Sequence, residues 1–168
     1  MTRMAVLPPL PYRATGLLAA AAAALALGIA YLSETWGGLV PCALCLLERW
    51  PYRVAIALGL AASVLPYGMG RVALAMLAMV ILTGVGFAAI HAGVEFHWWP
   101  SPLPECAAPS FGGGSIAERL SRMPAVPAKP CDEPVFLIPW LPLSMAAMNL
   151  LFGAAFAAIV IHALKGRR

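Results

Sequence analysis

The sequence predicts an all-α membrane protein, a bundle of four transmembrane helices joined by two loops outside the cytoplasm. Of its 168 residues, 62% are hydrophobic and only 11% are charged, and the mean hydropathy is +0.85. Ordinary soluble domains carry about 25% charged residues, and a domain of this size could not bury so many apolar side chains. The apolar residues also gather into four runs, and the charges are distributed unevenly between the ends of those runs.

Three of the four runs are long enough to cross a bilayer by themselves. They cover residues 14–32, 72–92 and 143–164, and a bilayer core needs about 20 apolar residues in a helix. A cleaved signal peptide is the alternative for the first run, because Arg3 and Arg13 precede it. The apolar region of a signal peptide is usually only about 7–15 residues long, however, which favours a transmembrane helix.

The remaining span, residues 46–65, is less obvious because Glu48, Arg49 and Arg53 lie in its first turns. Its apolar part, residues 54–65, would by itself suggest a buried or re-entrant helix. Two considerations favour a full span. Long arginine side chains near a helix end can reach the interface, and an even number of spans places both termini on one side. We therefore expect a single four-helix membrane domain over residues 1–168.

The charges predict the orientation of the four spans. The two termini and the connection between the second and third spans carry six basic residues and no acidic ones. The other side carries five basic residues and all seven acidic ones. Lys and Arg are enriched on the cytoplasmic side of membrane proteins. Both termini are therefore expected in the cytoplasm, with loops at about 33–45 and 93–142 on the opposite side.

All four cysteines fall in those two outer loops. Cys42 and Cys45 form a C-x-x-C motif, whereas Cys106 and Cys131 are separated by 24 residues. Four cysteines permit three pairings, and a disulfide within C-x-x-C closes so small a loop that it is more typical of redox chemistry than of stabilisation. A four-cysteine zinc site normally has two close pairs. We therefore expect no metal at these cysteines. Two purely structural disulfides remain the alternative to redox-active pairs.

The surroundings of Cys45 favour a reactive thiol. Pro41 precedes the expected helix and Cys45 lies at its start, where free backbone N–H groups and the helix dipole favour a thiolate. Arg49 follows four residues later on the same helix face. A helix N-terminus with a nearby cation lowers a cysteine pKa. The alternative for Arg49 is a side chain that reaches the interface or pairs with Glu48.

These residues occur in a recognisable arrangement. The run from Pro41 to Tyr52, PCALCLLERWPY, closely resembles the first-loop motif of the bacterial disulfide bond formation protein B family. The WPSP run at residues 99–102 before Cys106, and the CDE run at residues 131–133 before the last span, resemble the second loop of that family. The resemblance covers nearly the whole chain.

The resemblance implies a multi-pass protein of the bacterial inner membrane with periplasmic cysteine loops. Such a protein re-oxidises a periplasmic thioredoxin-fold dithiol oxidase, of the disulfide bond formation protein A type, and passes the electrons to a membrane quinone, ubiquinone or menaquinone. Carried over by motif, Cys42 and Cys45 become the quinone-proximal pair and Arg49 the quinone-binding cation. Cys106 and Cys131 become the pair that meets the partner protein.

Two other functions stay open at this stage. A vitamin K epoxide reductase-like thiol oxidoreductase should carry its C-x-x-C in the last helices, whereas here the motif opens the second. The second alternative is a non-enzymatic membrane subunit with structural disulfides.

Nucleic acid is not expected as a partner, because the basic residues form no stripe with interleaved aromatics. Some family members have a quinone-linked His near the end of the third span; His91 and His97 are both nearby and neither is in clear register, so packing or interface roles are expected for them.

Overall fold

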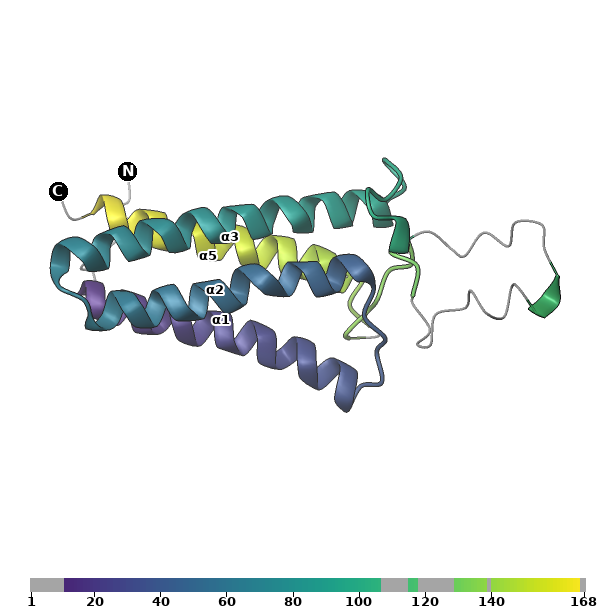
Figure 1. The fold of residues 1–168 in the computed structure, drawn as a ribbon, viewed down its shortest axis with the longest axis horizontal. Coiled ribbons are helices and arrows are strands. Elements are labelled where there is room, and N and C mark those ends of the chain that lie inside the picture. The colour runs from purple at the N-terminus through teal and green to yellow at the C-terminus, as the bar shows by residue number, and fades with distance from the viewer. Residues whose placement is uncertain (1–10, 107–114, 118–128, 139, 167–168) are drawn as a thin grey trace.

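The computed structural model describes residues 11–106, 115–117, 129–138 and 140–166. This part of the chain contains four long α-helices and no β-strand (Figure 1). The helices are α1 (Tyr12–Thr35), α2 (Ala43–Val64), α3 (Tyr67–Glu95) and α5 (Met145–Lys165), and a short 3-10 helix, η1, covers Pro104–Cys106. The predicted all-helical class is confirmed. Each predicted span lies on one of these helices, with ends that differ by five residues at most.

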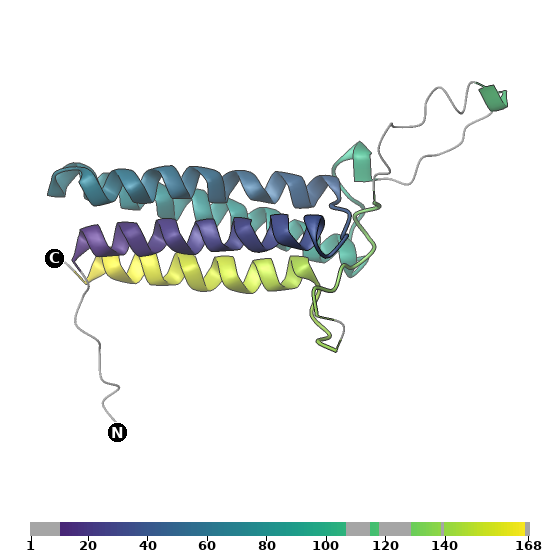
Figure 2. The same cartoon turned by 90° about the horizontal axis from the view of Figure 1, so that it is seen from below.

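The four helices pack side by side, each against the next in the chain. α1 packs on α2, α2 on α3, and α3 on α5. Figures 1 and 2 show the helices running up and down, so that α1 begins and α5 ends at the same end. The connections from α1 to α2 and from α3 to α5 lie at the other end, which also holds the cysteines.

Three helices, α1, α3 and α5, are long and apolar enough to cross a membrane. α2 has a similar length but carries Glu48, Arg49 and Arg53 in its first half. Large apolar side chains such as Leu18 and Met79 point outward from the bundle. That pattern fits contact with lipid, because a water-facing bundle would present polar side chains there.

Small residues bring α1 and α2 together. A Cβ atom at Gly59 would lie 2.7 Å from the Gly16 carbonyl oxygen, and one at Gly16 would lie 2.6 Å from the Gly59 carbonyl oxygen. Glycine and alanine at such contacts let the backbones of membrane helices approach closely. The tight contact fixes α2 beside α1, so that the first turns of α2 face the last turns of α1.

Side chains cap α2 and α5 at the end that holds the cysteines. The Ser144 hydroxyl accepts a hydrogen bond from the backbone N–H of Ala147, and the Cys42 thiol accepts one from the backbone N–H of Cys45. A side chain that accepts from these otherwise free N–H groups stabilises the start of a helix. The helix cap therefore places the Cys42 sulfur at the start of α2.

Candidate functional site

The two cysteine pairs lie in one buried cluster at this end of the bundle. Cys106 and Cys131 form a disulfide with a Cα–Cα distance of 4.9 Å. Cys42 and Cys45 are free, with their sulfurs 2.7 Å apart. Cys42, Cys106 and Cys131 are all buried, and they pack together with Leu44 and Val94, while the half-buried Cys45 packs against the same cluster. The fold thus brings together two pairs that are more than 60 residues apart in the sequence.

The Cys42 sulfur has the surroundings of a thiolate. It accepts the backbone N–H of Cys45 at 3.2 Å and lies 3.5 Å from Nε2 of His91. The hydrogen bond with the Cys45 side chain lowers the pKa of Cys42 most. The hydrogen bond with His91 is the next largest contact that lowers it. Together they outweigh burial and lower the pKa of Cys42 to about 5.

This finding differs from the expectation that Cys45 carries the thiolate. The backbone N–H of Cys45 donates to the Cys42 sulfur at 3.2 Å, and the Cys45 sulfur lies 2.7 Å from that same sulfur. The helix cap explains the difference. The free N–H at the start of α2 points back to the side chain at the cap position, which is Cys42, whereas Cys45 already lies inside the first turn.

His91 is held in the cysteine cluster by a chain of polar side chains. Its Nδ1 lies 2.8 Å from Oε1 of Glu48. The other oxygen of Glu48 accepts a hydrogen bond of 2.7 Å from the Asn149 amide. The Asn149 oxygen in turn accepts one of 2.6 Å from the Tyr52 hydroxyl. A carboxylate only accepts hydrogen bonds, so Nδ1 carries a proton and Nε2 faces the Cys42 sulfur.

Arg49 forms its ion pair across the bundle rather than along its own helix. Its guanidinium donates to both carboxylate oxygens of Glu34, in the last turn of α1. Its central carbon also lies 5.0 Å from the centre of the Tyr31 ring. Arg49 is buried in the bundle, and Glu48, the partner considered from the sequence, is bound instead by His91 and Asn149.

Arg49 and Cys45 both line a cavity of about 260 Å³. Most of its wall is apolar and comes from α1, α2 and α5, as in Leu25, Ile29 and Phe152. Cys45, Arg49 and His91 supply polar groups to the same wall. The cavity therefore suits a mostly apolar ligand that carries a few polar atoms.

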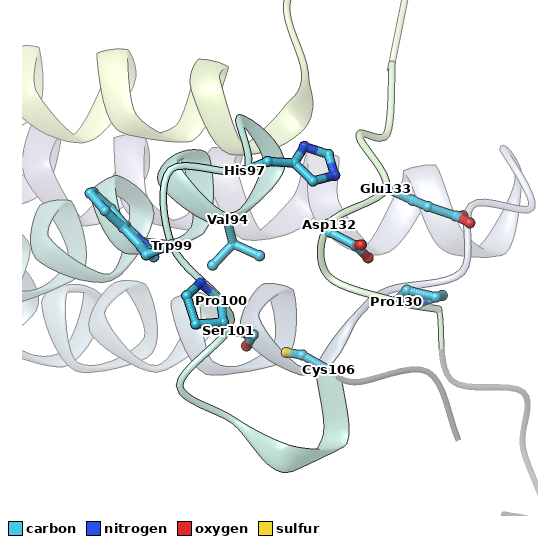
Figure 3. A pocket seen from close by; sticks show the side chains of 9 residues that line it. All are labelled: Val94, His97, Trp99, Pro100, Ser101, Cys106, Pro130, Asp132 and Glu133. Atoms are coloured by element: carbon cyan, nitrogen blue, oxygen red, sulfur yellow. The ribbon is translucent and has the colours of Figure 1, made fainter. Parts of the chain in front are cut away.

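A second cavity, of about 510 Å³, lies beside the disulfide. Trp99 and Pro100 line one side and Asp132 and Glu133 the other, and the Cys106 sulfur points toward Ser101 (Figure 3). The remaining wall consists of Val94, His97, Ser101 and Pro130. The Trp99 indole donates a hydrogen bond of 3.1 Å to the Ile90 carbonyl oxygen, which holds the start of the long loop against α3.

Sequence reasoning placed the four cysteines and Arg49 in the site, and the structure brings all five to one end of the bundle. The sequence did not indicate His91 as part of the site, since a packing or interface role was expected for it. Glu34 and Asn149 were also missed as partners. One signal was available: a polar Asn149 inside a largely apolar span needs a partner in the bundle. Ligand atoms of Cys42, Cys45 and His91 also lie within 4.8 Å of one another, so these three side chains could hold a metal ion.

Comparison with known proteins gave one result. The model of the family described as disulfide bond formation protein DsbB matches residues 12–163, nearly the whole chain. No curated protein and no solved structure matched.

Proposed function

Because the chain belongs to the disulfide bond formation protein DsbB family, we propose that it re-oxidises a periplasmic thioredoxin-fold dithiol oxidase and transfers the electrons to membrane quinone. The observation that supports this proposal best is the single cluster that holds both cysteine pairs. Disulfide exchange requires a thiolate to reach a sulfur of the next disulfide. Two buried pairs in one cluster meet that requirement with small movements.

The first step takes place at Cys106 and Cys131. A thiolate of the reduced partner attacks a sulfur of this disulfide, preferably that of Cys106, and a mixed disulfide forms. The partner's second thiol then attacks the mixed disulfide. The partner leaves with a disulfide, and Cys106 and Cys131 keep two electrons and two protons as thiols. The cavity beside the Cys106 sulfur offers room for the partner's chain.

The second step passes the electrons to the first pair. When Cys42 and Cys45 are joined by a disulfide, a thiolate of the second pair attacks one of their sulfurs. Exchange then leaves Cys106 and Cys131 oxidised again and Cys42 and Cys45 reduced. The His91 and Cys45 groups beside the Cys42 sulfur favour its thiolate, so Cys42 is a good leaving group in this exchange.

The reduced first pair lies beside the cavity proposed for the acceptor. A bound quinone supplies an acceptor of two electrons and two protons. The residues that would hold it are the apolar wall around Phe152 and Arg49, whose guanidinium would place positive charge beside a ring oxygen. Cys45 lines the same wall, and the Nδ1 proton of His91 is held by Glu48. His91 and Glu48 are therefore placed to move protons that leave the two thiols.

The membrane arrangement belongs to the same proposal. All four long helices span the inner membrane as one domain, both termini are cytoplasmic, and both cysteine loops are periplasmic. The uneven distribution of basic residues supports this orientation. In α2 the ion pair with Glu34 and the hydrogen bonds to Glu48 give two of its three charges partners within the protein, which reduces the cost of a charge at that depth. Residues 107–114, 118–128 and 139 of the long loop lie outside the described part of the chain.

The test is reduction of a soluble short-chain quinone by the purified protein in detergent micelles. The electron donor is a reduced periplasmic thioredoxin-fold dithiol oxidase. We expect turnover with the native chain and none with Cys45→Ser or Cys106→Ser. A non-enzymatic subunit with structural disulfides would give no turnover, and its cysteines would stay oxidised in thiol-trapping assays whether or not quinone is present.

A further inference from the structure

The free cysteine pair and His91 have the composition of a metal site. Cys42, Cys45 and His91 each offer one ligand atom, and these atoms lie within 4.8 Å of one another. Cys42 and His91 are buried, and Cys45 is half-buried. Thiolate sulfur and imidazole nitrogen are the ligands that Zn²⁺ prefers in proteins.

The neighbours of these ligands have the arrangement that accompanies bound metal. A metal-binding histidine nearly always donates its other ring N–H to a carboxylate, a carbonyl or water, which fixes the ring and the tautomer. Nδ1 of His91 lies 2.8 Å from Glu48, and Glu48 is held in turn by Asn149. The Nε2 atom is thereby turned to the sulfur of Cys42, 3.5 Å away.

We propose that Cys42, Cys45 and His91 form a binding site for Zn²⁺ when the two cysteines are reduced. Zn–S bonds are about 2.3 Å and Zn–N bonds about 2.0–2.1 Å, so two sulfurs at tetrahedral angles lie about 3.8 Å apart. The Cys42 and Cys45 sulfurs are 2.7 Å apart and must separate by about 1 Å. A small rotation of the half-buried Cys45 side chain provides this separation.

The charges of the cluster also suit a divalent cation. Two thiolates in a buried site repel each other, and Zn²⁺ balances both. Glu95 adds negative charge nearby, since its Oε1 atom lies 4.0 Å from Nε2 of His91. Binding releases the Cys45 proton into solution, since Cys42 is already a thiolate, and it involves no oxidation or reduction. Cys45 and His91 both line the apolar cavity, so the fourth coordination position opens toward it.

Bound zinc would stop electron transfer, a consequence that rests on the proposed function. A sulfur coordinated to Zn²⁺ cannot join its neighbour in a disulfide, so the reduced pair would be held until the metal is removed. Zinc binding itself needs only the reduced side chains. The metal measurement and the quinone assay can therefore fail separately: a protein that binds zinc but reduces no quinone contradicts the proposed function and leaves the metal site intact.

The experiment measures zinc bound to the full-length protein in detergent micelles. The protein is reduced, the reductant is removed without exposure to air, and bound metal is measured after equilibrium dialysis against Zn²⁺. We expect one zinc per reduced chain and none for the protein whose cysteines are all in disulfides. Co²⁺ in place of Zn²⁺ should give thiolate-to-cobalt charge-transfer bands and the visible bands of a tetrahedral ion.

Substitutions, together with an alkylation measurement on the native chain, identify the residues that bind zinc. Cys42→Ser and His91→Ala should abolish binding, and Glu48→Gln should weaken it roughly 10- to 100-fold, as loss of a supporting carboxylate does at other sites. His97→Ala, outside the cluster, should bind as the native chain does. In the native chain, zinc should protect Cys42 and Cys45 from alkylation while Cys106 and Cys131 react. Any of three results would overturn the proposal. The reduced native protein binds no zinc, His91→Ala keeps the native zinc affinity, or zinc protects Cys106 and Cys131 from alkylation in place of Cys42 and Cys45.

Discussion

The low pKa of Cys42 predicts a thiolate at neutral pH in the reduced protein. With a pKa of about 5, about 99% of Cys42 is ionised at pH 7, compared with about 3% of an ordinary thiol of pKa about 8.5. His91 contributes to this shift by its hydrogen bond. A hydrogen bond to a charged group is worth about 1.5–3 kcal/mol, so His91→Gln should raise the pKa of Cys42 by on the order of one unit or more.

The measurement is a pH titration of the ultraviolet absorbance of thiolate in the reduced protein. The native chain should show a step near pH 5 that is missing from Cys42→Ser and shifted upward in His91→Gln, while the control His97→Gln keeps it. Because folding lowers this pKa, ionised Cys42 stabilises the reduced fold, and the contribution declines from about pH 8.5 to about pH 5 as pH falls. The reasoning is refuted if no thiolate forms below pH 7, or if the step disappears in Cys45→Ser and persists in Cys42→Ser.

Three further predictions concern the acceptor site, the partner site and the packing. Arg49→Met should raise the apparent KM for quinone and slow oxidation of the first cysteine pair. Arg49→Lys should restore only part of the activity, because lysine lacks the planar guanidinium. Unchanged quinone kinetics in Arg49→Met would place the acceptor elsewhere. Cys131→Ala should accumulate a mixed disulfide between the partner and Cys106, detected on non-reducing gels, whereas an adduct that forms only in the reciprocal Cys106→Ala chain would reverse the two roles. Gly59→Ala places a Cβ 2.7 Å from a backbone oxygen of α1 and should destabilise the protein by about 1–3 kcal/mol in thermal unfolding. The control Gly28→Ala meets nothing within 4 Å and should leave the stability unchanged. Equal melting temperatures for the two variants would argue against tight packing at Gly59.

The helices could be predicted from the sequence because they depend on local signals. Long apolar runs fix α1, α3 and α5, and Pro66 separates α2 from α3. The charged first half of α2 was harder to interpret, since its ion pair with Glu34 comes from another helix. No local pattern reveals which residue of α1 will face Arg49, because that depends on how closely the two helices pack.

The site was predictable in its sulfur chemistry and not in its supporting groups. The C-x-x-C motif and the second pair are visible as residues, but which sulfur becomes the thiolate depends on the helix cap, and the cap falls on Cys42 rather than on Cys45. His91 enters the site because α3 runs antiparallel to α2, so that its last turns lie beside Glu48. Such contacts between distant segments arise only from the packing of the whole bundle.

The stoichiometry of electron transfer tests the central claim most directly. A known amount of reduced partner is mixed with catalytic amounts of the protein in micelles and an excess of quinone, without oxygen, and both products are counted. We predict one hydroquinone for each disulfide formed in the partner, with no product when quinone is omitted. Partner oxidation without hydroquinone, or hydroquinone without partner oxidation, would contradict a path from one cysteine pair through the other to quinone.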